Sequence, residues 1–220
     1  MTPIAIPYAK TDNQDLRFAL RSIDKYVPDN YVVLIGDKPD WYKGTAYPYP
    51  DKGPKEINII RKVLYASSIF SNFILTNDDI FWLREGYIYL YHEGTLRDKH
   101  NLVQNGYRRK IEATANLIGW DALFCDCHAP MWVNDLDYKK VYAYVKAEVL
   151  SKSLYGNNMS EKTVLFERYQ DLKINQPLRL HEIEAKLQGR QFFSVGDKGM
   201  NFDMGVYLQS LFPEKSQYEI

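Results

Sequence analysis

The sequence has 220 residues, of which 45% are apolar and 25% charged, values that are ordinary for a soluble globular protein with a substantial core. Lysine plus arginine equals aspartate plus glutamate, so no large basic field points to a nucleic-acid partner, although a local basic patch is compatible with this balance. No apolar stretch approaches membrane-spanning length, and the first residues lack the features of a signal peptide. We therefore expect a cytoplasmic protein.

The first elements along the chain predict a parallel sheet. Residues 4–8 and 31–35 are short apolar runs, and between them Leu16, Leu20 and Ile23 recur at helical spacing. A strand, a helix and a second apolar strand in this order are typical of a βαβ unit, in which the two strands run parallel.

A second helix is predicted over residues 55–68, and it leads into a third apolar strand at residues 73–75. Ligands of parallel α/β sheets bind at the carboxyl ends of the strands. In this sequence those ends are residues 7–10, residues 36–38 and residues 77–79.

The second half of the chain is expected to be more helical. Its pattern predicts helices over residues 101–118, 137–154, 160–172 and 202–211. Short strands are predicted at residues 87–91 and 191–195, and a short strand that runs into a turn is predicted over residues 123–131. The predicted fold is a single α/β domain over residues 1–220 with a mostly parallel central sheet; residues 1–125 form the ligand-binding half and residues 126–220 the more helical half.

Two adjacent carboxylates, Asp78 and Asp79, follow the third strand directly and are framed by apolar residues. Like charges held so close resist joint ionisation, and a divalent cation removes that cost. Mg²⁺ and Mn²⁺ prefer hard oxygen ligands from one or two carboxylates together with substrate phosphates. The alternative is a solvated turn, since Asn77-Asp78-Asp79 is also good turn chemistry. Asp78 and Asp79 are the predicted metal ligands.

Four motifs in the chain resemble those of one family, the Stealth proteins. They are, in order, the Asp-Leu-Arg-Phe-Ala-Leu-Arg-Ser-Ile pattern within residues 11–26, Asn77-Asp78-Asp79-Ile80-Phe81, His128-Ala129-Pro130, and the segment from Phe193-Ser194-Val195-Gly196-Asp197 to the Phe-Pro-Glu-Lys-Ser-Gln-Tyr-Glu tail at residues 212–219. Each motif alone is weak, but four in the right order cover most of the chain.

Stealth proteins transfer hexose-1-phosphate from nucleotide sugars, and their core is related to GT-A glycosyltransferases. Two departures matter. The family's Trp-Val-Asp-Gly signature is missing, and residues 4–8 look more like the first strand of an ordinary GT-A enzyme. The Asn-Asp of the fourth region is Gly196-Asp197 here. The resemblance implies a GT-A-like, Rossmann-like fold and a nucleotide-sugar donor, with a UDP-sugar expected first.

The resemblance also implies roles for single residues. Arg17, Arg21 and His128 would line the nucleotide and phosphate site, where guanidinium groups can make bidentate contacts. For the arginines, the alternative is a position on the solvated surface of the helix. For His128, the alternative is a structural role.

The two cysteines, Cys125 and Cys127, lie just before His128 in the sequence. A zinc site made of these three residues would have poor ligand spacing, so buried free thiols are expected instead.

His128 and Asp197 are the candidate catalytic residues, as acceptors for the proton of an attacking hydroxyl. Asp197 has an ordinary Gly-Asp turn as its alternative. Tyr8 and Asp37, at the ends of the first two strands, are further candidates for contact with the nucleotide; for Asp37 the alternative is a role in the turn.

The sequence thus predicts a glycosyltransferase that depends on Mn²⁺ or Mg²⁺ and moves a sugar from a nucleotide donor to an acceptor hydroxyl. The alternatives are Stealth-type hexose-1-phosphate transfer in polysaccharide synthesis, glycosyl transfer to modified DNA bases, and a non-catalytic module that binds a sugar or nucleotide. The expected partners are the nucleotide sugar and an acceptor saccharide or other hydroxyl compound.

Overall fold

The computed structural model describes residues 2–11, 14–104, 106–142, 149–158, 166–169 and 172–220. Its largest sheet has the strand order β3-β2-β1-β4-β7. The bounds are β1 (Pro3–Tyr8), β2 (Tyr31–Gly36), β3 (Thr45–Tyr47), β4 (Asn72–Leu75) and β7 (Met131–Asn134). The first four are parallel and β7 is antiparallel. The predicted α/β class with a mostly parallel central sheet is confirmed.

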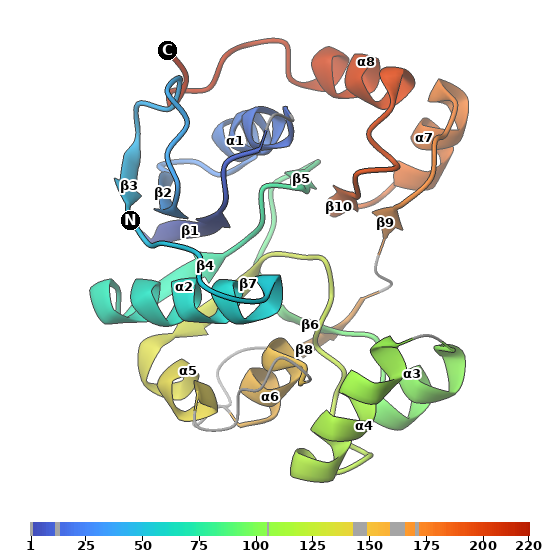
Figure 1. Ribbon diagram of the computed structural model, residues 1–220. Coiled ribbons are helices and arrows are strands. Elements are labelled where there is room, and N and C mark those ends of the chain that lie inside the picture. The colour runs from blue at the N-terminus through green and yellow to red at the C-terminus, as the bar shows by residue number, and fades with distance from the viewer. Residues whose placement is uncertain (1, 12–13, 105, 143–148, 159–165, 170–171) are drawn as a thin grey trace.

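Two helices cover opposite faces of this sheet, α1 (Asp15–Tyr26) and α2 (Lys55–Ile69) (Figure 1). Side chains alternate along a strand, so β1 contributes to both sides. Ile4 and Ile6 pack with the α1 side chains, whereas Ala5 packs with Val63 of α2. The continuous apolar runs of β1 and β2 therefore reflect burial on both faces.

A second, three-stranded sheet lies beside the first and has the order β5-β10-β9. Its strands are β5 (Ile80–Trp82), β10 (Phe192–Val195) and β9 (Lys173–Ile174). β5 and β10 are antiparallel, and β10 and β9 are parallel. Two helices, α7 (Leu180–Leu187) and α8 (Phe202–Leu211), pack on this sheet through a shared apolar cluster with Phe81 and Phe193.

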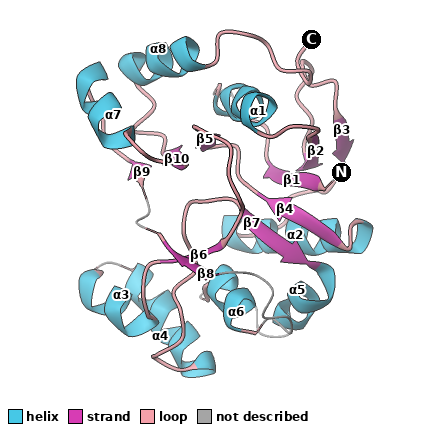
Figure 2. Ribbon diagram, turned by 180° about the vertical axis from the view of Figure 1, so that it is seen from behind, coloured by secondary structure: helices cyan, strands magenta, loops and turns pink. Residues whose placement is uncertain are grey.

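The remaining elements form the lower part of the molecule in Figures 1 and 2. They are β6 (Leu90–His92), α3 (Leu96–Leu102), α4 (Tyr107–Ile118), α5 (Asp135–Tyr142), α6 (Ser151–Asn157) and β8 (Phe166–Arg168). β6 pairs with β8 in parallel, and α6 packs against α4 and α5. The half from residue 126 onward thus contributes strands as well as helices.

The prediction of one long helix over residues 137–154 is wrong. Helix α5 ends at Tyr142, α6 begins at Ser151, and Val149 and Leu150 are not helical. The backbone N–H of Leu150 donates to Thr114 Oγ1 at 2.9 Å, and the Leu150 side chain is buried in the cluster around α3 and α4. This tertiary contact takes the chain out of helical geometry. Residues 143–148 lie outside the described part.

Other boundaries in the middle of the chain also differ from the predictions. The predicted helix over residues 101–118 is divided between the end of α3 and α4, and the strand expected at residues 87–91 begins only at Leu90. The strand expected at residues 123–131 begins at Met131. Of the predicted helix over residues 160–172, the described residues Phe166–Arg168 form a strand, because their backbone pairs with β6. The helix over residues 202–211 and the last strand are confirmed.

Both cysteines are free thiols, as expected. Cys125 and Cys127 are buried, and burial raises the pKa of Cys125 to about 12. The backbone N–H of Cys125 donates to Ser153 Oγ, which ties this segment to α6. Among the described residues, no helix is both long and apolar enough to cross a bilayer.

Candidate functional site

A cavity of about 960 Å³ opens at the carboxyl ends of β1 and β4. The strand order changes direction between these two neighbouring strands. From β1 the chain passes through α1 to β2 on one side, whereas β4, which follows α2, lies on the other side of β1. Ligands of open α/β sheets bind at such a switch point. The lining includes Pro7, Ala9, Thr11, Asp15, Asp51, Lys55, Lys62, Asn77, Asp78, Asp79, His128, Lys173, Asn175, Gly196, Asp197 and Lys198.

The predicted acidic pair occupies the turn that joins the two sheets. Asp78 and Asp79 lie between β4 and β5, and the Ile80 N–H closes the turn by donating to Asn77 O at 3.3 Å. The Val195 N–H, from β10, donates to Asp79 O at 3.1 Å. Both sheets therefore fix the direction in which this turn meets the cavity.

The carboxylate of Asp79 is incompletely satisfied in the described part of the chain. Its Oδ1 atom is buried and has no hydrogen-bond partner there, while Oδ2 lies 3.5 Å from Lys173 Nζ. Burial, and then the charge of Asp79, raise the pKa of Asp78 to about 6. Two adjacent, partly buried carboxylates, one of which has an oxygen without a hydrogen-bond partner in the described part of the chain, favour a bound cation.

Two observations test whether a divalent metal fits here. Within the described ranges, no three histidine, cysteine or acidic side chains are close enough together to hold a metal on their own. Mg²⁺-type sites usually have one or two carboxylates, with substrate phosphates and water completing the coordination. The buried, unsatisfied Oδ1 of Asp79 and the adjacent Asp78 fit that second kind of site.

Asp15 is a cavity residue that the sequence analysis did not single out. It begins α1 and is 3% exposed. Burial, and then the charges of Asp78, Asp79 and Asp197, raise the pKa of its carboxyl to about 7. An acidic residue in the first turn of a helix is ordinary, so the sequence carries no signal for this role.

His128, the predicted proton acceptor, also lines the cavity. Its Nε2 lies 3.3 Å from Lys173 Nζ. The turn that carries it is held from α6, because Lys152 Nζ donates to Cys127 O at 2.8 Å and Asp126 accepts hydrogen bonds from the N–H and hydroxyl of Ser153. Burial raises the pKa of Asp126.

Asp197 reaches the same cavity from the loop after β10. The preceding glycine lies close to β9: a Cβ added to Gly196 would lie 2.3 Å from Asn175 Oδ1, so the Asn175 side chain would have to move. The Gly196 N–H donates to Ile174 O at 3.0 Å, which keeps the loop against β9. The structure thus brings Asp78, Asp79, His128 and Asp197 together around one cavity.

Tyr8 and Asp37, the other predicted nucleotide contacts, are not among the residues that line this cavity. The Tyr8 side chain is buried, and its hydroxyl accepts a hydrogen bond from the Thr11 N–H at 3.4 Å. Asp37 Oδ2 accepts from the Lys10 N–H at 2.8 Å, and the Asp37 N–H donates to Tyr8 O. Both residues shape the end of β1, next to the cavity.

Arg17 and Arg21 are not among the residues that line this cavity, and their phosphate role stays a prediction. Arg21 Nε donates to Glu219 Oε1 at 2.7 Å and Arg17 Nη1 to Glu219 Oε2 at 2.9 Å. The Glu219 side chain is fully buried. A buried carboxylate requires such partners, and the arginines satisfy it.

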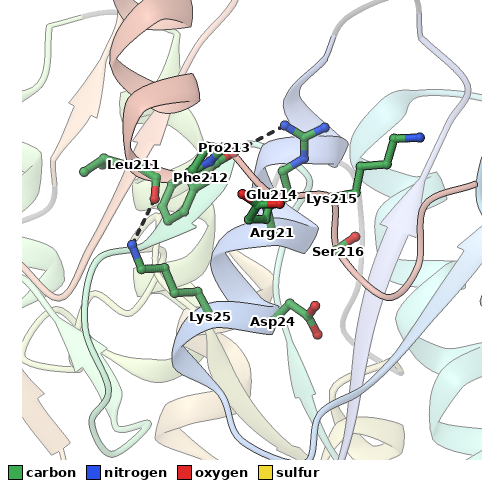
Figure 3. Close-up of a pocket in the computed structure, with 9 residues that line it drawn as sticks. All are labelled: Arg21, Asp24, Lys25, Leu211, Phe212, Pro213, Glu214, Lys215 and Ser216. Carbon is green, nitrogen blue, oxygen red and sulfur yellow. Dashed lines mark hydrogen bonds between the residues drawn. The ribbon is translucent and has the colours of Figure 1, made fainter.

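The same surface of α1 borders a smaller cavity of about 350 Å³ beneath the C-terminal tail (Figure 3). Arg21 donates to Phe212 O at 3.3 Å and Lys25 to Leu211 O at 2.9 Å, both visible as dashed lines in Figure 3. These contacts hold the tail on the helix.

Lys62 is a second cavity residue that the sequence analysis missed. It is 3% exposed and lies on α2, where its Nζ donates to Tyr8 O at 2.7 Å and pairs with Asp51 Oδ1 at 2.7 Å. A Cβ on Gly36 would lie 2.8 Å from this ammonium. A lysine on a helix surface is ordinary in sequence, and only the packing shows that it is buried.

No protein-family model matches the chain, and the search of curated proteins likewise finds no match. Among solved structures, the chain is similar to the apo form of the glycosyltransferase GlyE from Streptococcus pneumoniae TIGR4, with a TM-score of 0.48 and 10% identity. The alignment covers 100% of this chain and 66% of that one. A likeness at this level does not assign an activity.

Proposed function

We propose that the protein is a divalent-metal-dependent nucleotide-sugar transferase that moves a sugar from a nucleotide donor to an acceptor hydroxyl. The observation that carries this proposal is the position of Asp78 and Asp79, on a turn at the switch point between β1 and β4, beside a cavity of about 960 Å³. In particular, Asp79 presents a buried Oδ1 without a hydrogen-bond partner among the described residues.

Asp78 and Asp79 would hold Mn²⁺ or Mg²⁺, with phosphate oxygens of the donor completing the coordination. When bound, the metal supplies positive charge against the leaving diphosphate. Lys55, at the N-terminus of α2, lines the same cavity, so positive charge and helix N–H groups favour an anionic ligand there.

His128 and Asp197 are proposed as acceptors for the proton of the attacking hydroxyl. Both line the cavity that contains the acidic turn. A neutral imidazole or a carboxylate can take this proton once the acceptor is within hydrogen-bond reach. The acceptor class we propose is a saccharide or another compound with a free hydroxyl.

The test is incubation of the purified protein with Mn²⁺ and a panel of UDP-, GDP- and CMP-linked sugars, followed by mass spectrometry of the released nucleotide. Nucleoside diphosphate from a UDP- or GDP-sugar supports sugar transfer. Nucleoside monophosphate from the same donors would instead indicate sugar-1-phosphate transfer. Donor binding that depends on metal but gives no release with any acceptor would indicate a binding module.

Asp78→Asn and Asp79→Asn are expected to abolish metal-dependent donor binding and to lower turnover by about a hundredfold or more, as losses of electrostatic catalysis do. Asp121→Asn is the matched control, because Asp121 is exposed and pairs with Arg97 outside the cavity. If both cavity variants retained turnover at the level of the Asp121→Asn protein, the metal-dependent mechanism would be wrong.

A further inference from the structure

One lysine contacts two of the predicted functional groups. Lys173 begins β9, and its Nζ lies 3.5 Å from Asp79 Oδ2 and 3.3 Å from His128 Nε2. Its position is fixed by the second sheet, in which Lys173 is in register with Ser194 of β10. A single ammonium therefore bridges a predicted metal ligand and a predicted proton acceptor.

The chemistry of this bridge is asymmetric. An ammonium group has three N–H donors and no acceptor, so His128 Nε2 can only accept in this contact. On the other side, Lys173 is the cation that faces Asp79 Oδ2, while Oδ1 has no hydrogen-bond partner within the described ranges. The side chain of Lys173 is 28% exposed, which leaves it room to move.

A divalent cation bound through Asp79 would compete with this ammonium. Two positive charges a few ångströms apart repel each other, and the repulsion is strongest where solvent is partly excluded. The Asp79 side chain is 22% exposed, so the site is such an environment. Metal binding and the contact between Lys173 and Asp79 therefore oppose each other.

We propose that Lys173 is a positioning residue that caps Asp79 and His128 in the resting site and gives way when the metal and the donor bind. This inference rests on the metal-dependent function proposed above. On release, the phosphates of the donor offer the ammonium a new anionic partner. His128 Nε2, no longer engaged by Lys173, becomes accessible to the hydroxyl of the acceptor.

The test is a calorimetric titration of the full chain with Mn²⁺ alone, for the wild type, Lys173→Gln, Lys173→Arg and Lys198→Gln. Lys198 lines the same cavity, so Lys198→Gln removes the same charge from a nearby position. Removal of an ion-pair partner changes binding modestly, and we expect Lys173→Gln to bind Mn²⁺ roughly threefold to tenfold more tightly than Lys198→Gln. Lys173→Arg keeps the charge and should bind like the wild type.

Equal Mn²⁺ affinity of the Lys173→Gln and Lys198→Gln proteins would overturn the cap, and so would weaker binding by Lys173→Gln. Thermal unfolding verifies that each variant is folded, and Lys173→Met is the second variant if the glutamine protein is not. Asp79→Asn should bind Mn²⁺ weakly whichever residue stands at position 173.

The donor panel distinguishes failure of the cap from failure of the proposed function. Suppose that nucleotide release depends on metal but that the two glutamine variants bind Mn²⁺ with equal affinity. The proposed role of Lys173 would then be wrong, and the proposed transferase function would stand. Absence of Mn²⁺ binding in every variant would overturn the cap through its metal premise, and absence of release with every donor would overturn the transferase itself.

Discussion

At the scale of single residues, Asp15 shows how packing changes an ordinary side chain. It is 3% exposed, and burial together with Asp78, Asp79 and Asp197 raises the pKa of its carboxyl to about 7. The ordinary value is 3.8, so the folded protein binds this proton more tightly than the unfolded chain does. The contribution of Asp15 to stability is therefore fully present below about pH 4 and is lost as the pH rises towards 7.

Asp15→Asn is expected to increase the free energy of unfolding at pH 8 by about 2 to 4 kcal/mol, because a neutral amide carries no desolvation cost of charge. It should also flatten the pH dependence of stability between pH 4 and 7. Urea denaturation in EDTA, which removes divalent metals, measures both effects.

Asp203→Asn is the matched control for that experiment, since Asp203 lies in the first turn of α8 and lines no part of the large cavity. The free energy of unfolding of the Asp203→Asn protein should depend on pH in the same way as that of the wild type. An Asp15→Asn protein that is less stable than the wild type at pH 8 would contradict the assigned cost of the buried charge.

The sequence was informative about the acidic site only where residue type and position were both unusual. An Asp pair at a strand end, flanked by apolar residues, is unusual enough to indicate a functional site from the sequence alone. In the structure Asp78 and Asp79 line the cavity. Asp15, Lys62 and Lys173 have types that are common on helix and strand surfaces. Their burial or bridging depends on segments distant in sequence, which local patterns do not encode.

At the scale of elements, the buried carboxylate of Glu219 is one of the groups that hold the C-terminal tail to α1. Burial alone would raise the pKa of Glu219, but hydrogen bonds from Arg21, the backbone N–H of Ser216 and Arg17 lower it to about 2. The family resemblance implies a phosphate role for these two arginines, and in the structure both bind a carboxylate of the chain itself. The local motif specified two arginines on one helical face but not their partner.

Glu219→Gln is expected to lower the free energy of unfolding at pH 7 by about 3 kcal/mol, since it leaves two arginines beside a buried neutral group. The depressed pKa of Glu219 means that its contribution is present above about pH 4.5 and is lost as the pH falls towards 2. Chemical denaturation at pH 7 and at pH 3 should therefore show a smaller difference between variant and wild type at the lower pH.

Glu214→Gln is the control in the same tail, because Glu214 is exposed. It should match the wild type within about 0.5 kcal/mol, the usual range for surface substitutions. If Glu219→Gln were equally harmless, the interaction of the tail with α1 would not be a significant source of stability.

At the scale of the whole molecule, the cavity is assembled from segments of both sheets. It takes residues from the ends of β1 and β4, from the start of α2, and from the strands and loops around β9 and β10. A ligand that fills it should therefore oppose separation of the two sheets. Binding to the folded state alone stabilises a protein by about 2.7 kcal/mol at a hundredfold excess over the dissociation constant.

We expect Mn²⁺ with a UDP-sugar to slow amide hydrogen exchange together in peptides that cover residues 72–79, with β4 and the acidic turn, and residues 192–198, with β10. Strands β4 and β10 belong to different sheets. Hydrogen exchange with mass spectrometry measures this, and the Asp78→Asn protein under the same conditions is the control. Protection confined to one of the two peptides would show that the ligand does not join the sheets.

The βαβ start of the fold was predictable because its strands and helix are local and strongly periodic. The long helix expected over residues 137–154 was not realised, since Leu150 is drawn into the cluster between α3 and α4. Pairing between strands as distant as β6 and β8, or β5 and β10, depends on contacts that no single segment specifies.

The burial of Cys125 and Cys127 makes it possible to measure local unfolding of the segment that contains them. A thiol reagent attacks the thiolate, and in the folded protein these two sulfur atoms are shielded, with the pKa of Cys125 raised to about 12. The sequence contains no other cysteine. Labelling kinetics with such a reagent would report, without any introduced probe, how often the segment between α4 and β7 exposes its interior.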